Sequence, residues 1–111
     1  MPLTVPPAGA SFLGAPVVTD LDGLAADYAV IGIPHGVPYD PEGPVTTASL
    51  APRAVRERSE RYGAFREHHD FDTGGPLLPP GVRVVDVGDV PTDPADPAGN
   101  RERASRAVAA L

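Results

Sequence analysis

Two apolar stretches define the interior of the predicted fold. The first, Tyr28 to Ile33, is apolar without alternation, which is typical of a strand covered on both faces in a parallel sheet. Pro34 cannot donate to a strand ladder, so we expect this strand to end there. The second stretch, Val82 to Val87, is rich in valine, which is also typical of an interior parallel strand, and it ends at Gly88-Asp89. The pattern therefore predicts two interior strands of a parallel α/β sheet.

A helical period lies between these strands. It predicts an amphipathic helix over Leu50 to Tyr62, with Pro52 in the first turn, where its missing N–H costs little. The predicted apolar face comprises Ala51, Ala54, Val55, Tyr62 and Phe65, and the predicted polar face comprises Arg53, Arg56, Glu57 and Glu60. Strand, helix and strand in this order form a βαβ unit.

The two ends of the chain differ in character. Residues 1–11 lack periodicity and are expected to form a tail or a strap, which Phe12, Leu13 and Pro16 anchor to residues 12–111, the α/β domain. Near the other end, Asn100 is the expected N-cap of a second helix. Its predicted apolar face comprises Ala104, Ala107, Val108 and Leu111. Because two parallel strands are not expected to be stable alone, we expect the front portion of a larger, incomplete domain.

Composition narrows the classes of partner. The 111 residues carry a net charge of −6, and all nine basic residues are arginines. This balance argues against a nucleic-acid partner. The absence of cysteine excludes disulfides and thiolate metal sites. We expect no membrane span, because no apolar run approaches about 20 residues, and a cytoplasmic location is the default expectation.

The stretch from Pro34 to Thr47 is the first place to look for function. It is a loop of about 14 residues, against two to six in an ordinary strand-to-helix connection. Ligands bind at the carboxyl ends of strands in α/β sheets, so His35, Tyr39 and Asp40 are candidate substrate-binding residues. The alternative is that Asp40 makes a turn and His35 packs against a neighbouring loop.

Several short motifs, in order, make residues 12 to 111 resemble the N-terminal part of the ureohydrolases, the arginase and agmatinase family. After "FLGAP", Gly32, Ile33 and Pro34 match a G-[VI]-P tripeptide. Pro52, Ala54, Val55 and Arg56 match the helix opening G-P-x-A-[IV]-R, and Asp86, Gly88 and Asp89 match D-x-G-D. The agmatinase-like branch is the most similar. Two departures concern the loop: His35-Gly36 replaces the family's aspartate, and Val45 to Leu50 replaces an arginine-bearing element.

The resemblance implies a three-layer α/β/α domain that hydrolyses a guanidino or amidino C–N bond, releasing urea and an amine. In that family two manganese ions activate a hydroxide, because a guanidinium is a poor electrophile. The motifs that hold these metals, G-G-D-H, D-A-H-x-D and a later D-x-D, do not occur here and are expected downstream of Leu111. The 111-residue chain alone is accordingly expected to be inactive, and the full-length enzyme to be a homo-oligomer.

For two other groups of charged residues we expect a structural role or none. The cluster His68 to Asp72 is expected to be a solvated polar loop, although His and Asp this close can ligate a metal. Asp86 and Asp89 are expected to tie down backbone N–H groups. Asp40 and Glu42 favour a small cationic substrate such as agmatine.

Two other classes of function stay open. A nucleotide-binding domain needs a tight glycine turn from strand into helix, and Gly36 is followed instead by a long loop. A non-catalytic chain that associates with an intact relative is the third possibility.

Overall fold

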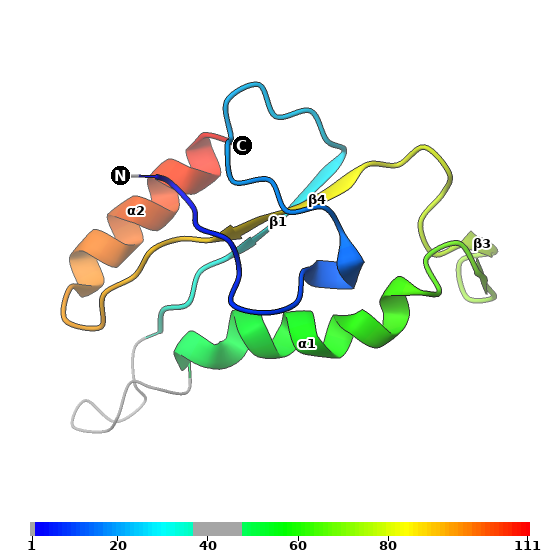
Figure 1. Cartoon of the computed structure of the whole chain (residues 1–111), viewed down its shortest axis with the longest axis horizontal. Helices are drawn as coiled ribbons and strands as arrows, with labels where there is room; N and C mark the ends of the chain where they lie inside the picture. Colours follow the sequence, from blue (N-terminus) through cyan, green and yellow to red (C-terminus); the bar gives the residue numbers. More distant parts are fainter. Residues whose placement is uncertain (1, 37–47) are drawn as a thin grey trace.

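The fold is built on two parallel strands and the helix between them. The computed structural model describes residues 2–36 and 48–111. Strand β1 (Tyr28–Gly32) pairs with β4 (Val84–Asp89) in parallel, and helix α1 (Ala51–Gly63) lies between them in the chain (Figure 1). The predicted βαβ arrangement and its parallel strands are therefore confirmed.

The predicted boundaries need small corrections. Helix α1 begins and ends one residue later than predicted, and β1 ends one residue earlier. Strand β4 begins two residues late and continues through Asp89. It continues because Gly88, with φ of 82°, forms a bulge: Val30 pairs with Asp86, but Gly32 pairs with Asp89. A glycine ended the strand in the prediction, whereas here it bends the strand without ending it.

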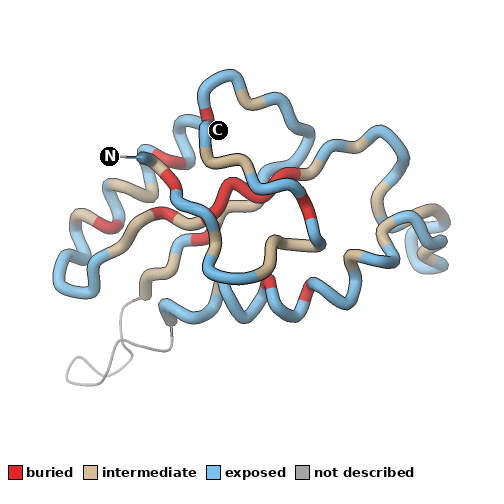
Figure 2. Tube along the Cα trace, viewed as in Figure 1, coloured by how far each residue is buried: buried red, intermediate tan, exposed pale blue. Residues whose placement is uncertain are grey.

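The core is small and centred on β4. Val85 and Val87 are fully buried and pack with Leu21. Four partly buried side chains surround them: Leu3, Val18, Leu24 and Ile31. Figure 2 shows buried positions concentrated along β4. The expectation that both strands are covered on both faces was wrong for β1, where Tyr28 is 62% exposed.

The N-terminal segment lies along the edge of β4 that faces away from β1. Val5 forms an antiparallel bridge with Asp89, and Val17 a parallel bridge with Asp86. Four backbone hydrogen bonds of 2.8 to 2.9 Å fix these two contacts. Between them, the short helix η1 (Phe12–Gly14) sits against α1. The stretch from Val5 to Val17 thus acts as a discontinuous third strand.

Helix α1 presents a different face to the domain from the one predicted. Its buried residues are Arg56 and Ser59, whereas Val55 and Tyr62 are about half exposed. The reason is polar: Ser59 Oγ accepts from Leu13 N at 2.9 Å, and Arg56 reaches the acidic residues of β4. Ion pairing and hydrogen bonding, which a helical wheel does not include, orient this helix.

Helix α2 (Pro97–Ala109) begins four residues before the predicted start. Its N-cap is Asp96, whose Oδ1 accepts from Gly99 N at 3.1 Å, and Pro97 occupies the first turn. The prediction of Asn100 as N-cap was wrong, since Asn100 lies inside the helix and is buried. Of the predicted apolar face, Ala107 is buried and Val108 is half exposed.

Three further elements complete the described chain. The short helix η2 (Ala48–Leu50) leads into α1. Strands β2 (His69–Asp70) and β3 (Gly75–Pro76) form a small antiparallel hairpin that the sequence pattern did not predict. None of the helices in the described residues has the length and apolar character that crossing a membrane requires.

Candidate functional site

A small pocket lies where the predicted site was expected, beyond the carboxyl ends of the two parallel strands. Its volume is about 90 Å³. The residues that line it come from the end of β1, the turn before α1 and the start of α2: Pro34, His35, Gly36, Ser49, Thr92, Pro94 and Asn100. The edge of the sheet therefore brings together three segments that are distant in the sequence.

Backbone hydrogen bonds position His35 in this pocket. Val90 N donates to Gly32 O at 2.9 Å, which extends the pairing of the strands past the end of β1. Thr92 Oγ1 then donates to Pro34 O at 3.0 Å. His35 itself is half-buried. The other two candidate substrate-binding residues, Tyr39 and Asp40, lie outside the described residues.

Asn100 is the residue of this pocket that sequence reasoning misplaced. Its Oδ1 accepts from Asp93 N at 2.8 Å and from Arg103 Nη2. Its Nδ2 donates to Asp93 O at 2.7 Å and lies 3.2 Å from His35 Nδ1. An asparagine followed by a helical pattern suggests a cap. Asp96-Pro97 upstream was the signal that the helix starts earlier.

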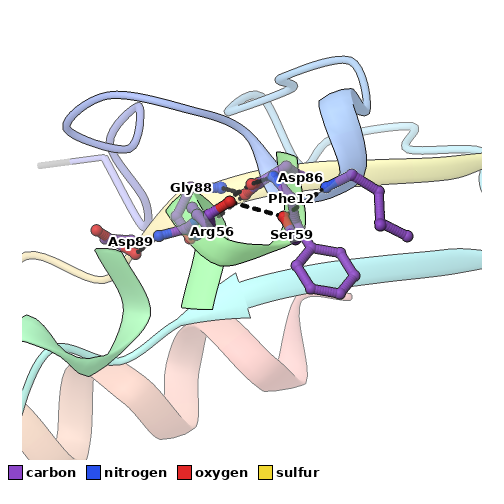
Figure 3. A network of polar contacts seen from close by, with 7 residues as sticks. Phe12, Arg56, Ser59, Asp86, Gly88 and Asp89 are labelled. Carbon is purple, nitrogen blue, oxygen red and sulfur yellow. Dashed lines mark hydrogen bonds and ion pairs between the residues drawn. The ribbon is translucent and has the colours of Figure 1, made fainter. Parts of the chain in front are cut away.

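The strongest polar network in the described chain joins α1 to β4 (Figure 3). Arg56 makes a two-pronged ion pair with Asp86, through Nε at 2.9 Å and Nη2 at 3.0 Å. Its Nη1 pairs with Asp89, and Nη2 also donates to Gly88 O at 3.0 Å. The Asp86 carboxylate accepts two more hydrogen bonds, from Phe12 N at 2.8 Å and Gly88 N at 2.9 Å.

The charges in this network stabilise one another. Burial alone would raise the pKa of Asp86, but Arg56 and the backbone N–H groups of Phe12 and Gly88 outweigh it and hold that pKa below its ordinary value. Burial alone would likewise lower the pKa of Arg56, but Asp86 and Asp89 raise it. Both groups therefore stay ionised, which suits a structural ion pair.

The predicted role of the D-x-G-D residues is confirmed for Asp86, but the prediction was incomplete. Asp86 does tie down backbone N–H groups, but the prediction omitted Arg56, which it placed on the solvent side of its helix. The signal available was the arginine that closes the G-P-x-A-[IV]-R motif, 30 residues before an acidic turn. The prediction weighed that residue only by its helical face.

Two motif glycines lie where the network and the N-terminal segment leave no room for a side chain. A Cβ on Gly32 would lie 1.8 Å from Asp89 Oδ1, and a Cβ on Gly88 would lie 2.0 Å from Val5 O. Gly88 also has a positive φ, which other residues rarely adopt. The G-[VI]-P, arginine and D-x-G-D motifs thus converge on one point, where α1, β1 and β4 meet. Their convergence gives the signature a structural role.

The cluster His68 to Asp72 lies in and around the β2–β3 hairpin, away from this edge. His69 packs edge-to-face on Phe71, and Asp70 Oδ1 accepts from Asp72 N at 2.9 Å. Within residues 2–36 and 48–111, no three His, Cys, Asp or Glu side chains are grouped so that they could hold a metal ion. The described residues therefore do not fit a binuclear manganese centre.

Comparison with known proteins agrees with the motifs. A family model described as "Arginase family" matches residues 26–111. No curated protein and no solved structure matches significantly. The matched segment contains β1, α1, β4 and α2, and with them every residue of the Arg56 network except those of η1. The match favours a ureohydrolase-like portion over a nucleotide-binding domain, and the chain belongs to the arginase family.

Proposed function

We propose that this chain forms the front portion of a manganese-dependent ureohydrolase, which hydrolyses a C–N bond of a linear guanidino compound to urea and an amine. The observation that carries the proposal is the family match over residues 26–111. The convergence of the three motifs on Arg56, Asp86 and Asp89 supports it. The manganese ligands are proposed to lie outside these residues, because the described ones do not form such a centre.

The proposed substrate is decarboxylated, as agmatine is. The stretch from Pro34 to Thr47, which the sequence predicts to be a loop, carries Asp40 and Glu42 and no Lys or Arg. A negative field at the mouth of the site attracts a cation and repels a carboxylate. Arginine would bring its carboxylate to this loop, whereas agmatine has none. His35, Tyr39 and Asp40 are the proposed contacts.

The test is to measure kcat/KM for agmatine and for arginine with the full-length protein in the presence of manganese. We expect agmatine to be preferred. We also expect Asp40→Asn to reduce that preference about fivefold, since a single charge contact contributes up to about 1 kcal/mol. Asp72→Asn, on the exposed hairpin, is the matched control and should leave the ratio unchanged.

The possible outcomes separate the reaction from its substrate. A preference for arginine, or a ratio that Asp40→Asn does not change, would remove this loop from the specificity argument. Failure to release urea from any guanidino compound would contradict the proposed reaction.

A further inference from the structure

Asn100 determines which hydrogen-bonding group His35 offers to the pocket. Oxygen and nitrogen of an asparagine amide are told apart by their partners. One amide atom of Asn100 faces Asp93 N and Arg103 Nη2, which can only donate. That atom must be the oxygen. The other atom is therefore the nitrogen, and it faces Asp93 O, which can only accept.

The same nitrogen lies 3.2 Å from His35 Nδ1. Because the amide nitrogen is a donor, His35 Nδ1 must be the acceptor, and the proton of the neutral ring is on Nε2. Asn100 is itself 1% exposed, and its amide makes three further hydrogen bonds, so it has no freedom to turn over. His35 is thus held as a donor through Nε2–H.

The pocket has room for a small group. Its volume of about 90 Å³ compares with about 30 Å³ for each molecule of liquid water. A planar group of three or four non-hydrogen atoms is therefore the right size. Among the residues that the structure describes, His35 is the one ionisable side chain in its lining. We propose that this pocket binds a carbonyl or carboxylate oxygen, which accepts a hydrogen bond from His35 Nε2, and that Asn100 is the positioning residue.

This inference rests on the described geometry alone and is independent of the proposed reaction. It also restricts which groups His35 can bind, because a protonated guanidinium offers only hydrogen-bond donors. His35 Nε2–H then contacts an acceptor oxygen and does not bind the guanidinium head of a substrate. Urea, the product of the proposed reaction, carries a carbonyl oxygen and suits the pocket.

The first test is the tautomer of His35 in the unmodified chain. Long-range proton–nitrogen NMR at about pH 8, well above the ordinary histidine pKa of about 6.5, distinguishes the two ring nitrogens. We expect the proton on Nε2 of His35. His68 and His69, on the hairpin, serve as internal references. A proton on Nδ1 would overturn the assignment of Asn100.

The second test uses three planar probes of the same shape: urea, acetate and guanidinium, each up to about 0.1 M at matched ionic strength. Such small ligands bind weakly, with Kd on the order of 10 mM. We expect urea or acetate to shift the NMR signals of His35 and Thr92 with a Kd at least about tenfold lower than that of guanidinium. If urea binds more tightly than acetate, the pocket prefers a neutral ligand, and if acetate binds more tightly, it prefers an anionic one. Equal or tighter binding of guanidinium, or no shift with any probe, would overturn the proposal.

Variants identify the donor. His35→Phe should weaken the better probe about tenfold, while His35→Gln, whose amide can donate, should retain part of the binding. His69→Phe is the matched control on the hairpin and should bind as the unmodified chain does. Unchanged binding by His35→Phe would contradict the role of Nε2. Urea release by the full-length enzyme is a separate readout, so this site and the proposed reaction can fail independently.

Discussion

Arg56 is 3% exposed, and a cation can be withdrawn from water to that degree only when opposite charges and acceptors replace its hydration. Asp86 and Asp89 supply the charges, and the Gly88 carbonyl supplies an acceptor. The ion pairs of Arg56 link the middle of α1 to the end of β4, so their loss would remove the link between these two elements. Side-chain chemistry at one residue therefore decides how a whole helix is oriented.

Arg56→Met should destabilise the chain by about 3–5 kcal/mol, because it leaves the Asp86 charge buried without its partner. Arg53→Met is the matched control on the same helix. Arg53 pairs with Glu57 at 3.0 Å in an exposed position, and its loss should cost no more than about 0.5 kcal/mol. Urea-induced unfolding measures both. Similar costs for the two variants would contradict the structural role of Arg56.

The network also predicts how stability depends on pH. The pKa of Asp86 in the folded chain is below its ordinary value of 3.8. The stability that it contributes is therefore complete above that ordinary value and is lost as the pH falls toward the lower folded value. The pKa of Arg56 is raised, so this group affects stability only in strong alkali, where a free guanidinium begins to lose its proton.

We accordingly expect the free energy of unfolding to fall as the pH drops below about 4. In Arg56→Met, the buried carboxylate has lost its cation, so the same acid range should cost less stability. Denaturation curves across this range compare the two proteins. An equally steep loss in the variant would show that other carboxylates control acid unfolding.

Thr4 presents the opposite case. Its side chain is 1% exposed, and its hydroxyl has no hydrogen-bond partner among the described residues. An unsatisfied buried hydroxyl costs about 1–3 kcal/mol, so Thr4→Val, which keeps the shape, should stabilise the chain by about 1 kcal/mol. Thermal unfolding provides the test, with the exposed Thr73→Val as control. A lower melting temperature for Thr4→Val would mean that the hydroxyl has a partner.

Among the elements, those predicted correctly have a strong local signal. The apolar runs of β1 and β4 and the period of α1 are visible without any tertiary information. The β2–β3 hairpin has two-residue strands and a turn at Gly74, which is too little pattern to detect. The buried face of α1 was predicted wrongly because the partners of Arg56 lie 30 or more residues away in the sequence.

The start of α2 gives a test at this scale. Asp96→Ala removes the side chain that caps the helix and should cost about 1 kcal/mol. Glu102→Ala changes an exposed acidic residue within the same helix and should have little effect. Chemical denaturation of both variants measures the difference. If Asp96→Ala were as stable as the control, the cap would contribute nothing.

At the scale of the whole molecule, the position of the pocket beside His35 was predictable, and its lining was predictable only in part. The rule that ligands gather at the carboxyl ends of parallel strands led to His35. Asn100 could not be found in this way, because it reaches the pocket from a helix 65 residues later. A sequence pattern shows which element carries a side chain, and only the fold shows which distant side chain it meets.

Metal binding also belongs to this scale, because its ligands come from several parts of a chain. We expect no stoichiometric manganese binding by the 111 residues, since the described part groups no three suitable ligands. Isothermal titration with manganese measures it, and His69→Ala is the accompanying variant. Tight binding that disappears in His69→Ala would show that the hairpin cluster is a metal site after all.

The N-terminal segment has a consequence for the direction in which the sheet can grow. Val5 and Val17 occupy the backbone groups on one side of β4, and β1 occupies the other side. Among the described residues, the edge of β1 away from β4 has no strand beside it. Hydrogen exchange should therefore be slower at Asp86 and Asp89 than at the amides on that edge of β1. A further strand, from this polypeptide or another, can therefore add beside β1, so the stretch from Val5 to Val17 makes extension of the sheet one-sided.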